Sequence, residues 1–218
     1  MAAIKKLRRK RREASAAPLK REQIVATALA LVDREGLKAL SMRRLGAELG
    51  VDPMAVYYHI PNKEALLDAI VEAVMASIDL SVDHSTYPPV ERILCAARAY
   101  RDAMLAHANA LPIVLARGPA TVAAMRPVEL LIGILRDAGL PPAEAFFGMN
   151  VIAAAVRGCV GMLANSDNKP SREEMEEFSR NFPHGEFPHL YESLPYSGDF
   201  TDRGFDFGIR ALAKGLLS

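Results

Sequence analysis

The fold of this chain is decided by one stretch, SMRRLGAELGVDPMAVYYHI, at residues 41–60. The side chain of Asp52 can cap a helix N-terminus, and proline suits the first position of a helix. We therefore expect a helix to begin at Pro53. Gly50 ends the preceding helix in a tight turn, where positive φ costs glycine little, and Gly46 is small where the two helices must cross. The stretch therefore predicts a helix-turn-helix.

The second helix of such a motif lies in the major groove of DNA and leads with its N-terminal residues. Tyr57 and Tyr58 cannot both face inward on a short helix, which favours a contact surface; in the alternative interpretation the two helices are a packing motif with tyrosines in a core. The guanidinium of Arg43 can reach O6 and N7 of one guanine, whereas hydroxyls, the imidazole and Lys63 suit phosphates. The candidate DNA-contacting residues are Ser41, Arg43, Arg44, Pro53, Met54, Ala55, Tyr57, Tyr58, His59 and Lys63.

The formal net charge of +1 conceals an asymmetry between the two ends of the chain. Residues 1–70 carry 14 Lys or Arg against 8 Asp or Glu, a charge of +6, whereas residues 71–218 carry 13 against 18, a charge of −5. The basic run within residues 1–18 predicts a flexible arm that adds affinity for a phosphate backbone. Only the N-terminal part suits a polyanion.

Helical periodicity continues from Leu19 to the C-terminus without an alternating stretch, so we expect an all-α protein. We expect a helix-turn-helix DNA-binding domain of three helices at residues 19–66 and a larger helical ligand-binding and dimerisation domain at residues 67–218. A loop is expected at residues 182–199. The expected helices cover about residues 19–36, 41–49, 53–59, 62–78, 89–104, 111–118, 120–138, 142–164, 171–181 and 201–217.

Residues 145–164 are nearly apolar and must be tested as a membrane span. Arg157 lies inside this stretch, and an arginine at a bilayer centre costs about 2.5–3.5 kcal/mol on insertion scales. We therefore expect a buried helix of a soluble protein and no membrane contact. Cys95 and Cys159 lie in apolar helical stretches and are expected as buried thiols in a reducing, cytoplasmic compartment.

The sequence resembles the tetracycline-repressor (TetR) family of bacterial transcription regulators. The resemblance rests on Asp33-Arg-Glu-Gly36, Leu40-Ser-Met-Arg-Arg-Leu-Gly-Ala-Glu-Leu-Gly-Val51, Tyr57-Tyr-His59 and Asn62-Lys-Glu-Ala-Leu-Leu-Asp68. It places groove contacts on Arg43 and on the residues from Pro53 to His59, and a phosphate clamp on Lys63. The second half is similar to the C-terminal domain of the tetracycline-repressor type, through Tyr100-Arg-Asp-Ala-Met-Leu-Ala-His107, Gly158-Cys159 and Phe205-Asp-Phe-Gly-Ile-Arg-Ala-Leu-Ala-Lys-Gly215. The resemblance also implies a homodimer through the helices near 142–164 and 201–217, with an inducer site in each subunit.

Aromatic and methionine side chains in the second half suit an adaptable small-molecule cavity, although for any single one of them a place in the core is the more common outcome. Val114 stands where the family's founding member has the histidine of its magnesium–tetracycline site, so that ligand is not expected. Arg157 is expected either in an ion pair, within the protein or across a dimer, or as a ligand anchor. The candidate ligand-binding residues are Tyr100, Met104, His107, Val114, Arg117, Phe146, Met149, Asn150 and Arg157.

The expected function is that of a ligand-responsive repressor, which binds a palindromic DNA operator as a homodimer and is released by a small-molecule inducer. An activator, or a regulator without a ligand, would have the same sequence features. An enzyme acting in the C-terminal cavity is the competing class, but no nucleophile elbow, zinc-binding HExxH, CxxC pair or phosphate-binding glycine loop occurs. We expect no metal and no cofactor. A helical adaptor that has lost DNA binding is a further alternative.

Overall fold

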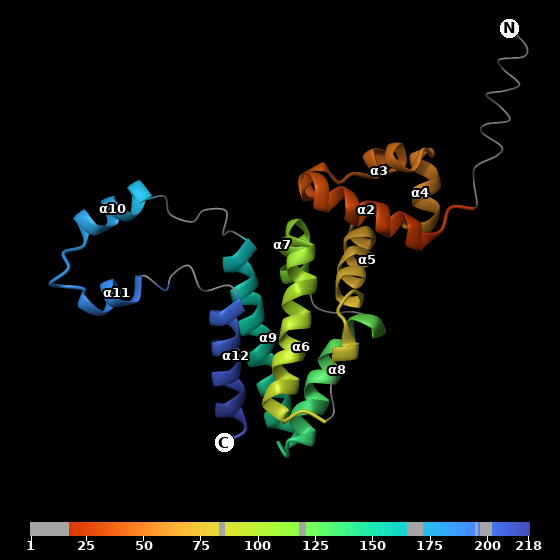
Figure 1. Cartoon of the computed structure of the whole chain (residues 1–218). Coiled ribbons are helices and arrows are strands. Elements are labelled where there is room, and N and C mark those ends of the chain that lie inside the picture. Colours follow the sequence, from red (N-terminus) through yellow and green to blue (C-terminus); the bar gives the residue numbers. More distant parts are fainter. Residues whose placement is uncertain (1–17, 83–85, 118–120, 165–171, 195, 197–201) are drawn as a thin grey trace, which may run out of the picture.

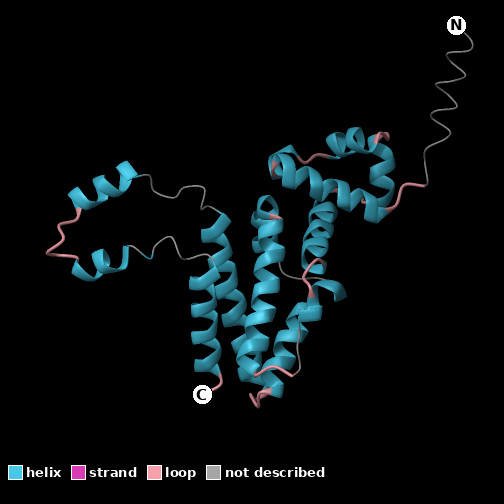
Figure 2. Ribbon diagram, in the orientation of Figure 1, coloured by secondary structure: helices cyan, strands magenta, loops and turns pink. Residues whose placement is uncertain are grey.

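The structure is a computed structural model of the whole chain, and it describes residues 18–82, 86–117, 121–164, 172–194, 196 and 202–218. Within these ranges every regular element is helical and none is a strand, as the periodicity predicts (Figures 1 and 2). A small N-terminal unit lies at one end of a larger bundle (Figure 1). The basic arm expected at residues 1–18 lies outside the described residues except for Pro18.

The N-terminal unit consists of α2 (Arg21–Glu35), α3 (Met42–Leu49) and α4 (Pro53–His59), with a 3-10 turn at Leu37–Ala39. Each of the two short helices begins at a side-chain cap. The Ser41 hydroxyl accepts from the backbone N–H of Arg44 at 3.1 Å, and the Asp52 carboxylate accepts from that of Met54 at 2.9 Å. The expected boundaries of both helices are confirmed, because the caps satisfy backbone donors that the helices themselves leave unpaired.

Two glycines fix the angle between α3 and α4. Gly50 adopts φ +68°, in the left-handed region, and ends α3 there. A Cβ on Gly46 would lie 3.1 Å from the carbonyl oxygen of Val51 and 3.2 Å from the nitrogen of Pro53, both backbone atoms that cannot rotate away. The close crossing predicted at Gly46 is therefore present. Beneath it, Leu45 and Val56 are fully buried.

The larger bundle is built from α5 (Lys63–Ala76), α6 (Pro89–Ala106), α8 (Val122–Asp137), α9 (Pro142–Ala164) and α12 (Asp202–Leu216). Helix α6 lies centrally, against α8, α9 and α12, and the short α7 (Leu111–Ala116) packs beside α5. Ion pairs fasten α12 to α6: Arg98 binds Asp206, Arg210 binds Glu91, and Arg101 binds Asp202.

Helix α5 belongs to both parts of the molecule. It packs against α2 of the N-terminal unit and against α7 and α8 of the bundle. The domain boundary expected between residues 66 and 67 thus falls inside one continuous helix. A second link joins the two parts: His107 Nδ1 lies 2.9 Å from a carboxylate oxygen of Asp33, and the amide of Asn109 donates to the Asp33 carbonyl at 2.9 Å.

The prediction of a loop at residues 182–199 is only partly correct, because the helix α11 (Pro188–Ser193) lies within this range. Pro188 occupies the first turn of α11, where its missing N–H is not needed. The Tyr191 hydroxyl donates to the carbonyls of Phe182 at 2.6 Å and of Ser179 at 3.1 Å, which ties α11 to α10 (Arg172–Asn181). The two helices stand apart from the bundle (Figure 1).

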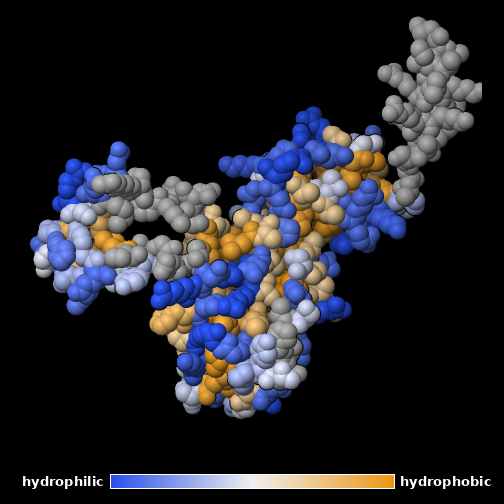
Figure 3. All heavy atoms as spheres, in the orientation of Figure 1, coloured by the Kyte–Doolittle hydropathy of each residue, from blue (hydrophilic) through white to orange (hydrophobic). Residues whose placement is uncertain are grey.

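Helix α9 is long and apolar enough to cross a membrane by length and composition alone, which is weak evidence for a span. One face packs on α6, α8 and α12. The burial expected for α9 holds for this face, whereas Phe147, Val151 and Met162 are exposed on the opposite face of the single chain. Hydrophobic side chains also reach the surface along α12 (Figure 3). Cys95 and Cys159 are free thiols that are half-buried rather than buried, and burial raises the pKa of Cys159.

Candidate DNA interface and ligand cavity

The outer surface of α4 presents the side chains that the sequence placed in the major groove. Met54 and Tyr58 are 71% and 87% exposed, and Tyr57 is also exposed, so the alternative in which both tyrosines lie in a core is wrong. Val56 alone of this short helix is buried. His59 is half-buried and stacks edge-to-face on Tyr58, with ring centroids 5.2 Å apart. Helix α4 is thus held by the buried Val56 and by its cap, and it exposes Met54, Tyr57 and Tyr58.

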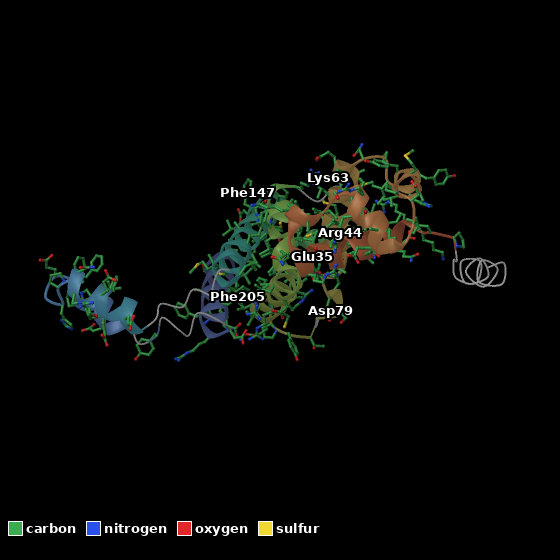
Figure 4. The ribbon with its side chains drawn as sticks, turned by 90° about the horizontal axis from the view of Figure 1, so that it is seen from above. Glu35, Arg44, Lys63, Asp79, Phe147 and Phe205 are labelled. Atoms are coloured by element: carbon green, nitrogen blue, oxygen red, sulfur yellow. The ribbon has the colours of Figure 1, made fainter. Side chains whose placement is uncertain are left out.

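Arg43 and Arg44 are neighbours on α3 with different surroundings. Arg44 donates to Glu35 at 3.0 Å and to Glu48 at 2.8 Å, in a network that also contains Arg34. Figure 4 shows Arg44 and Glu35 together at the N-terminal unit. Arg43 is exposed and, among the described residues, has no ion pair. Arg43 is therefore the arginine of α3 that is available to a base, whereas Arg44 is engaged in holding α3 to α2.

Lys63 is the first residue of α5 and is exposed beside α4. The helix begins there because the Asn62 side chain accepts from the backbone N–H of Ala65 at 2.8 Å. A helix N-terminus carries a partial positive charge, and Lys63 adds a full one at the same place. This arrangement favours a phosphate group next to the exposed face of α4.

A cavity of about 440 Å³ lies in the bundle between α5, α6, α7, α8 and α9. Ligand sites of small molecules have volumes of this order. Most of the lining is aliphatic, aromatic or methionine side chains, contributed by all five helices. Those that the sequence also singled out are Tyr100, Val114, Arg117, Phe146, Met149, Asn150 and Arg157.

Two of the sequence candidates lie elsewhere. Met104 is fully buried in the core and does not line the cavity. His107 follows the end of α6 and contacts Asp33 of the N-terminal unit instead. Both were grouped with Tyr100 because helical spacing places them along α6, but periodicity does not say where along a helix the packing leaves a space.

The cavity also has lining residues that the sequence did not single out, among them Met75, Asp79, Met125 and Ile152. Met75, Ile78 and Ile152 are buried apolar residues at helical spacing, which is the pattern of any core position. No signal in the sequence distinguishes the wall of a cavity from the centre of a core. Asp79 sits just after α5, where its carboxylate accepts from the backbone N–H of Ser81 at 2.9 Å and from its hydroxyl at 2.7 Å.

Arg117 connects the cavity with the start of α5. Its guanidinium binds the carboxylates of Glu64 and Asp68, one helical turn apart on α5, while the same residue lines the cavity. These hydrogen bonds raise the pKa of Arg117 further above its already high usual value. Glu64 directly follows Lys63, so a side chain at the cavity wall holds the turn of α5 that carries the proposed phosphate contact.

Comparison with known proteins identifies two regions of the chain. Residues 24–70 match a family described as bacterial regulatory proteins, tetR family, and residues 90–218 match the tetracyclin repressor-like C-terminal domain. The tetracycline repressor protein class C of Escherichia coli is 29% identical over 207 residues, which cover 91% of this chain and 90% of that protein.

Two solved structures are similar to this chain in three dimensions. ActR from Streptomyces coelicolor, a TetR family protein, in complex with actinorhodin, superposes with a TM-score of 0.77 at 30% identity, covering 93% of this chain and 97% of that chain. BioQ of Mycobacterium smegmatis with its double-stranded DNA operator superposes with a TM-score of 0.63 at 27% identity, covering 91% and 98%.

Proposed function

The chain belongs to the TetR family and is a DNA-binding transcriptional regulator; we propose that it is a repressor that binds a palindromic operator as a homodimer and is released by a small molecule in the cavity. The observation that carries the proposal is the pair of separate sites: an exposed α4 surface at one end and a largely apolar cavity in the bundle. Two relatives support the proposal: BioQ was solved with its DNA operator, and ActR was solved with the small molecule actinorhodin.

The DNA contacts proposed for α4 and its neighbours divide into two sorts. Met54, Ala55 and Pro53 would contact thymine methyl groups, and Arg43 would donate to a guanine. Tyr57, Tyr58, His59, Lys63 and the Ser41 hydroxyl would contact phosphates, which position the protein without reading sequence. Arg44 supports this surface through its contacts with Glu35 and Glu48.

The dimer is proposed to form through the outer faces of α9 and α12. Phe147 on α9 and Phe207 on α12 are 63% and 75% exposed, and Gly158 has nothing within 4 Å of an added Cβ, so a neighbouring helix has room to approach. Figure 4 shows Phe147 at the outer edge of the bundle. A Phe207→Glu variant is expected to sediment as a monomer and to lose operator binding, whereas Val122→Glu is the control, because Val122 is an 81% exposed apolar residue of α8 outside the cavity lining.

Release is proposed as a population shift in which Arg117 couples the two sites. In the structure Arg117 holds Glu64 and Asp68 of α5. A ligand in the cavity binds more tightly to a conformer in which α5 has moved, so that the two copies of α4 no longer match successive major grooves about 34–36 Å apart. A ligand with equal affinity for both conformers would shift nothing.

The coupling is tested by Arg117→Met, which keeps an unbranched apolar side chain and removes the charged guanidinium. We expect weaker operator binding without any ligand, because α5 is no longer held. Arg126→Gln is the control, since Arg126 is an exposed arginine on α8 outside the cavity lining. Unchanged operator affinity in Arg117→Met would show that these ion pairs do not carry the coupling.

Operator binding itself is tested by footprinting on the DNA that flanks the chain's own gene, across a series of salt concentrations. We expect protection of a two-fold symmetric site of roughly 15–20 base pairs and an affinity that falls steeply with salt. If neither this DNA nor an unbiased selection of binding sites yields a protected sequence, the adaptor alternative replaces the proposal. Turnover of a cavity ligand would instead support an enzyme. As a regulator of transcription, the protein is proposed to act in the cytoplasm.

A further inference from the structure

The cavity has a sharply unequal distribution of polar groups. Among the described residues its lining contains five that carry hydrogen-bonding or charged side chains: Asp79, Tyr100, Arg117, Asn150 and Arg157. The remainder is apolar, from α5, α6, α7, α8 and α9. The few polar groups in such a site fix the orientation of a ligand, so their existing partners decide which of them a ligand can use.

Three of the five are already engaged within the protein. Arg117 binds Glu64 and Asp68. The Asn150 amide donates to the carbonyl of Phe146 at 2.8 Å. The Asp79 carboxylate accepts two hydrogen bonds from Ser81, which lower its pKa. Both of these hydrogen bonds go to Oδ1 of the one carboxylate in the described lining, and no histidine accompanies it.

Arg157 is in the opposite situation. It lies on α9 one turn beyond Ala153 and next to Val156, on the stripe of that helix that lines the cavity. It is half-buried, and over the described part of the chain it has neither a hydrogen bond nor an ion pair. A guanidinium has five N–H donors and remains charged, so its partial burial without a carboxylate leaves donors to be satisfied.

We infer that the cavity takes a metal-free, largely apolar aromatic ligand with one anionic group, a carboxylate, sulfonate or phenolate, which binds the Arg157 guanidinium. This inference rests on the proposed effector role of the cavity and names the class of effector. The apolar walls bind the ring system, and the Tyr100 hydroxyl is a second uncommitted polar group of the lining. The inference excludes a chelated divalent cation as the group that orients the ligand.

Two fluorescent probes separate the contribution of the anion from that of the rings. 8-Anilinonaphthalene-1-sulfonate carries one sulfonate, and N-phenyl-1-naphthylamine has the same ring system without it. Both are titrated against the full chain and against Arg157→Gln, Arg157→Lys and the control Arg180→Gln, whose arginine is exposed on α10. Ala153→Phe, which narrows the cavity, reports whether the probes occupy it.

For Arg157→Gln we expect binding of the sulfonate probe to weaken roughly tenfold or more, the effect of removing a charge-assisted hydrogen bond, while the uncharged probe changes less than about twofold. Arg157→Lys should fall between, because it keeps the charge and loses the planar fork. Arg180→Gln should bind both probes as the unmodified chain does, and Ala153→Phe should weaken both.

Four outcomes would overturn the inference. If Arg157→Gln weakens the binding of both probes equally, Arg157 is only part of the cavity wall. If it weakens the binding of neither probe, Arg157 does not anchor the anionic group. Probes that bind Ala153→Phe normally would not be in the cavity. Dissociation of the dimer by Arg157→Gln, measured by sedimentation, would assign Arg157 to an ion pair between subunits. Operator footprinting of the unmodified chain reports separately on the proposed regulatory function.

Discussion

The N-terminal unit and the C-terminal bundle are both built from helices with one buried face, but they place their candidate functional residues differently. In the N-terminal unit the core is tight and the candidate functional groups point outward, with Val56 buried while Tyr58 is almost fully exposed. In the bundle most of the candidate ligand-binding residues line a cavity of about 440 Å³ that the helices leave between them. A surface that reads DNA requires rigid support, whereas a site that binds a small molecule requires incomplete packing.

The largest effect is expected from Gly46→Leu, which disrupts the tight packing of the N-terminal unit. Its side chain would meet the backbone at Val51 and Pro53, so the α3–α4 crossing must open. We expect a destabilisation of about 1–3 kcal/mol or more and loss of operator binding. Urea unfolding and footprinting measure the two effects. Both naphthyl probes should still bind the bundle; if they do not, the two regions are less independent than their packing indicates.

Deletion of residues 1–16 tests whether the basic arm belongs to the DNA surface. The variant should bind all DNA more weakly, and the slope of log affinity against log salt should become shallower by about 0.9 for each phosphate that the arm neutralises in the full chain. Sequence preference should survive, because phosphate contacts carry no sequence information. An unchanged slope would separate the arm from the DNA surface.

Arg43→Ala and Lys63→Ala sharpen the comparison within the N-terminal unit. We expect Arg43→Ala to cost about 1–3 kcal/mol at the preferred base and to relax specificity there. Lys63→Ala should weaken binding evenly across sequences and reduce the salt slope by about 1. Binding-site selection with each variant measures the difference. Retained base preference in Arg43→Ala would show that Arg43 does not read a base.

The smallest effect is expected from Glu35→Gln. Hydrogen bonds from Arg34 lower the pKa of Glu35, with Arg44 contributing through its charge. A lowered pKa means that the stabilising contribution is present above the pKa of the unfolded chain and is lost as the pH falls through the folded value. The Tm of the unmodified chain should exceed that of Glu35→Gln near neutral pH, and the difference should disappear in acid.

Glu129→Gln on α8 is the control for this measurement, because Glu129 is exposed and has no ion pair among the described residues. A pH-independent difference in Tm between the unmodified chain and Glu35→Gln would mean that the charge of Glu35 plays no part. Because the whole network is at the surface, screening by salt should reduce the difference.

The sequence by itself determined most of the N-terminal unit. Caps at Ser41, Asp52 and Asn62 and the turn at Gly50 are local signals, each satisfied within a few residues, so they could be located without a tertiary structure. The adjacent tyrosines likewise showed from spacing alone that one side of α4 must be exposed. The residue patterns of this unit also carried the stronger part of the resemblance to a known family.

The tertiary structure alone decided which residues of the bundle surround an empty space. Met104 and Tyr100 share a helix and an apolar neighbourhood, yet only Tyr100 lines the cavity, because the difference depends on how α5, α7, α8 and α9 pack around α6. The same holds for charges: only the packing shows that Arg117 has two carboxylate partners and that Arg157 has none among the described residues. A hydrophobic pattern records that a side chain leaves water, and the positions of distant helices decide whether another side chain or a cavity receives it.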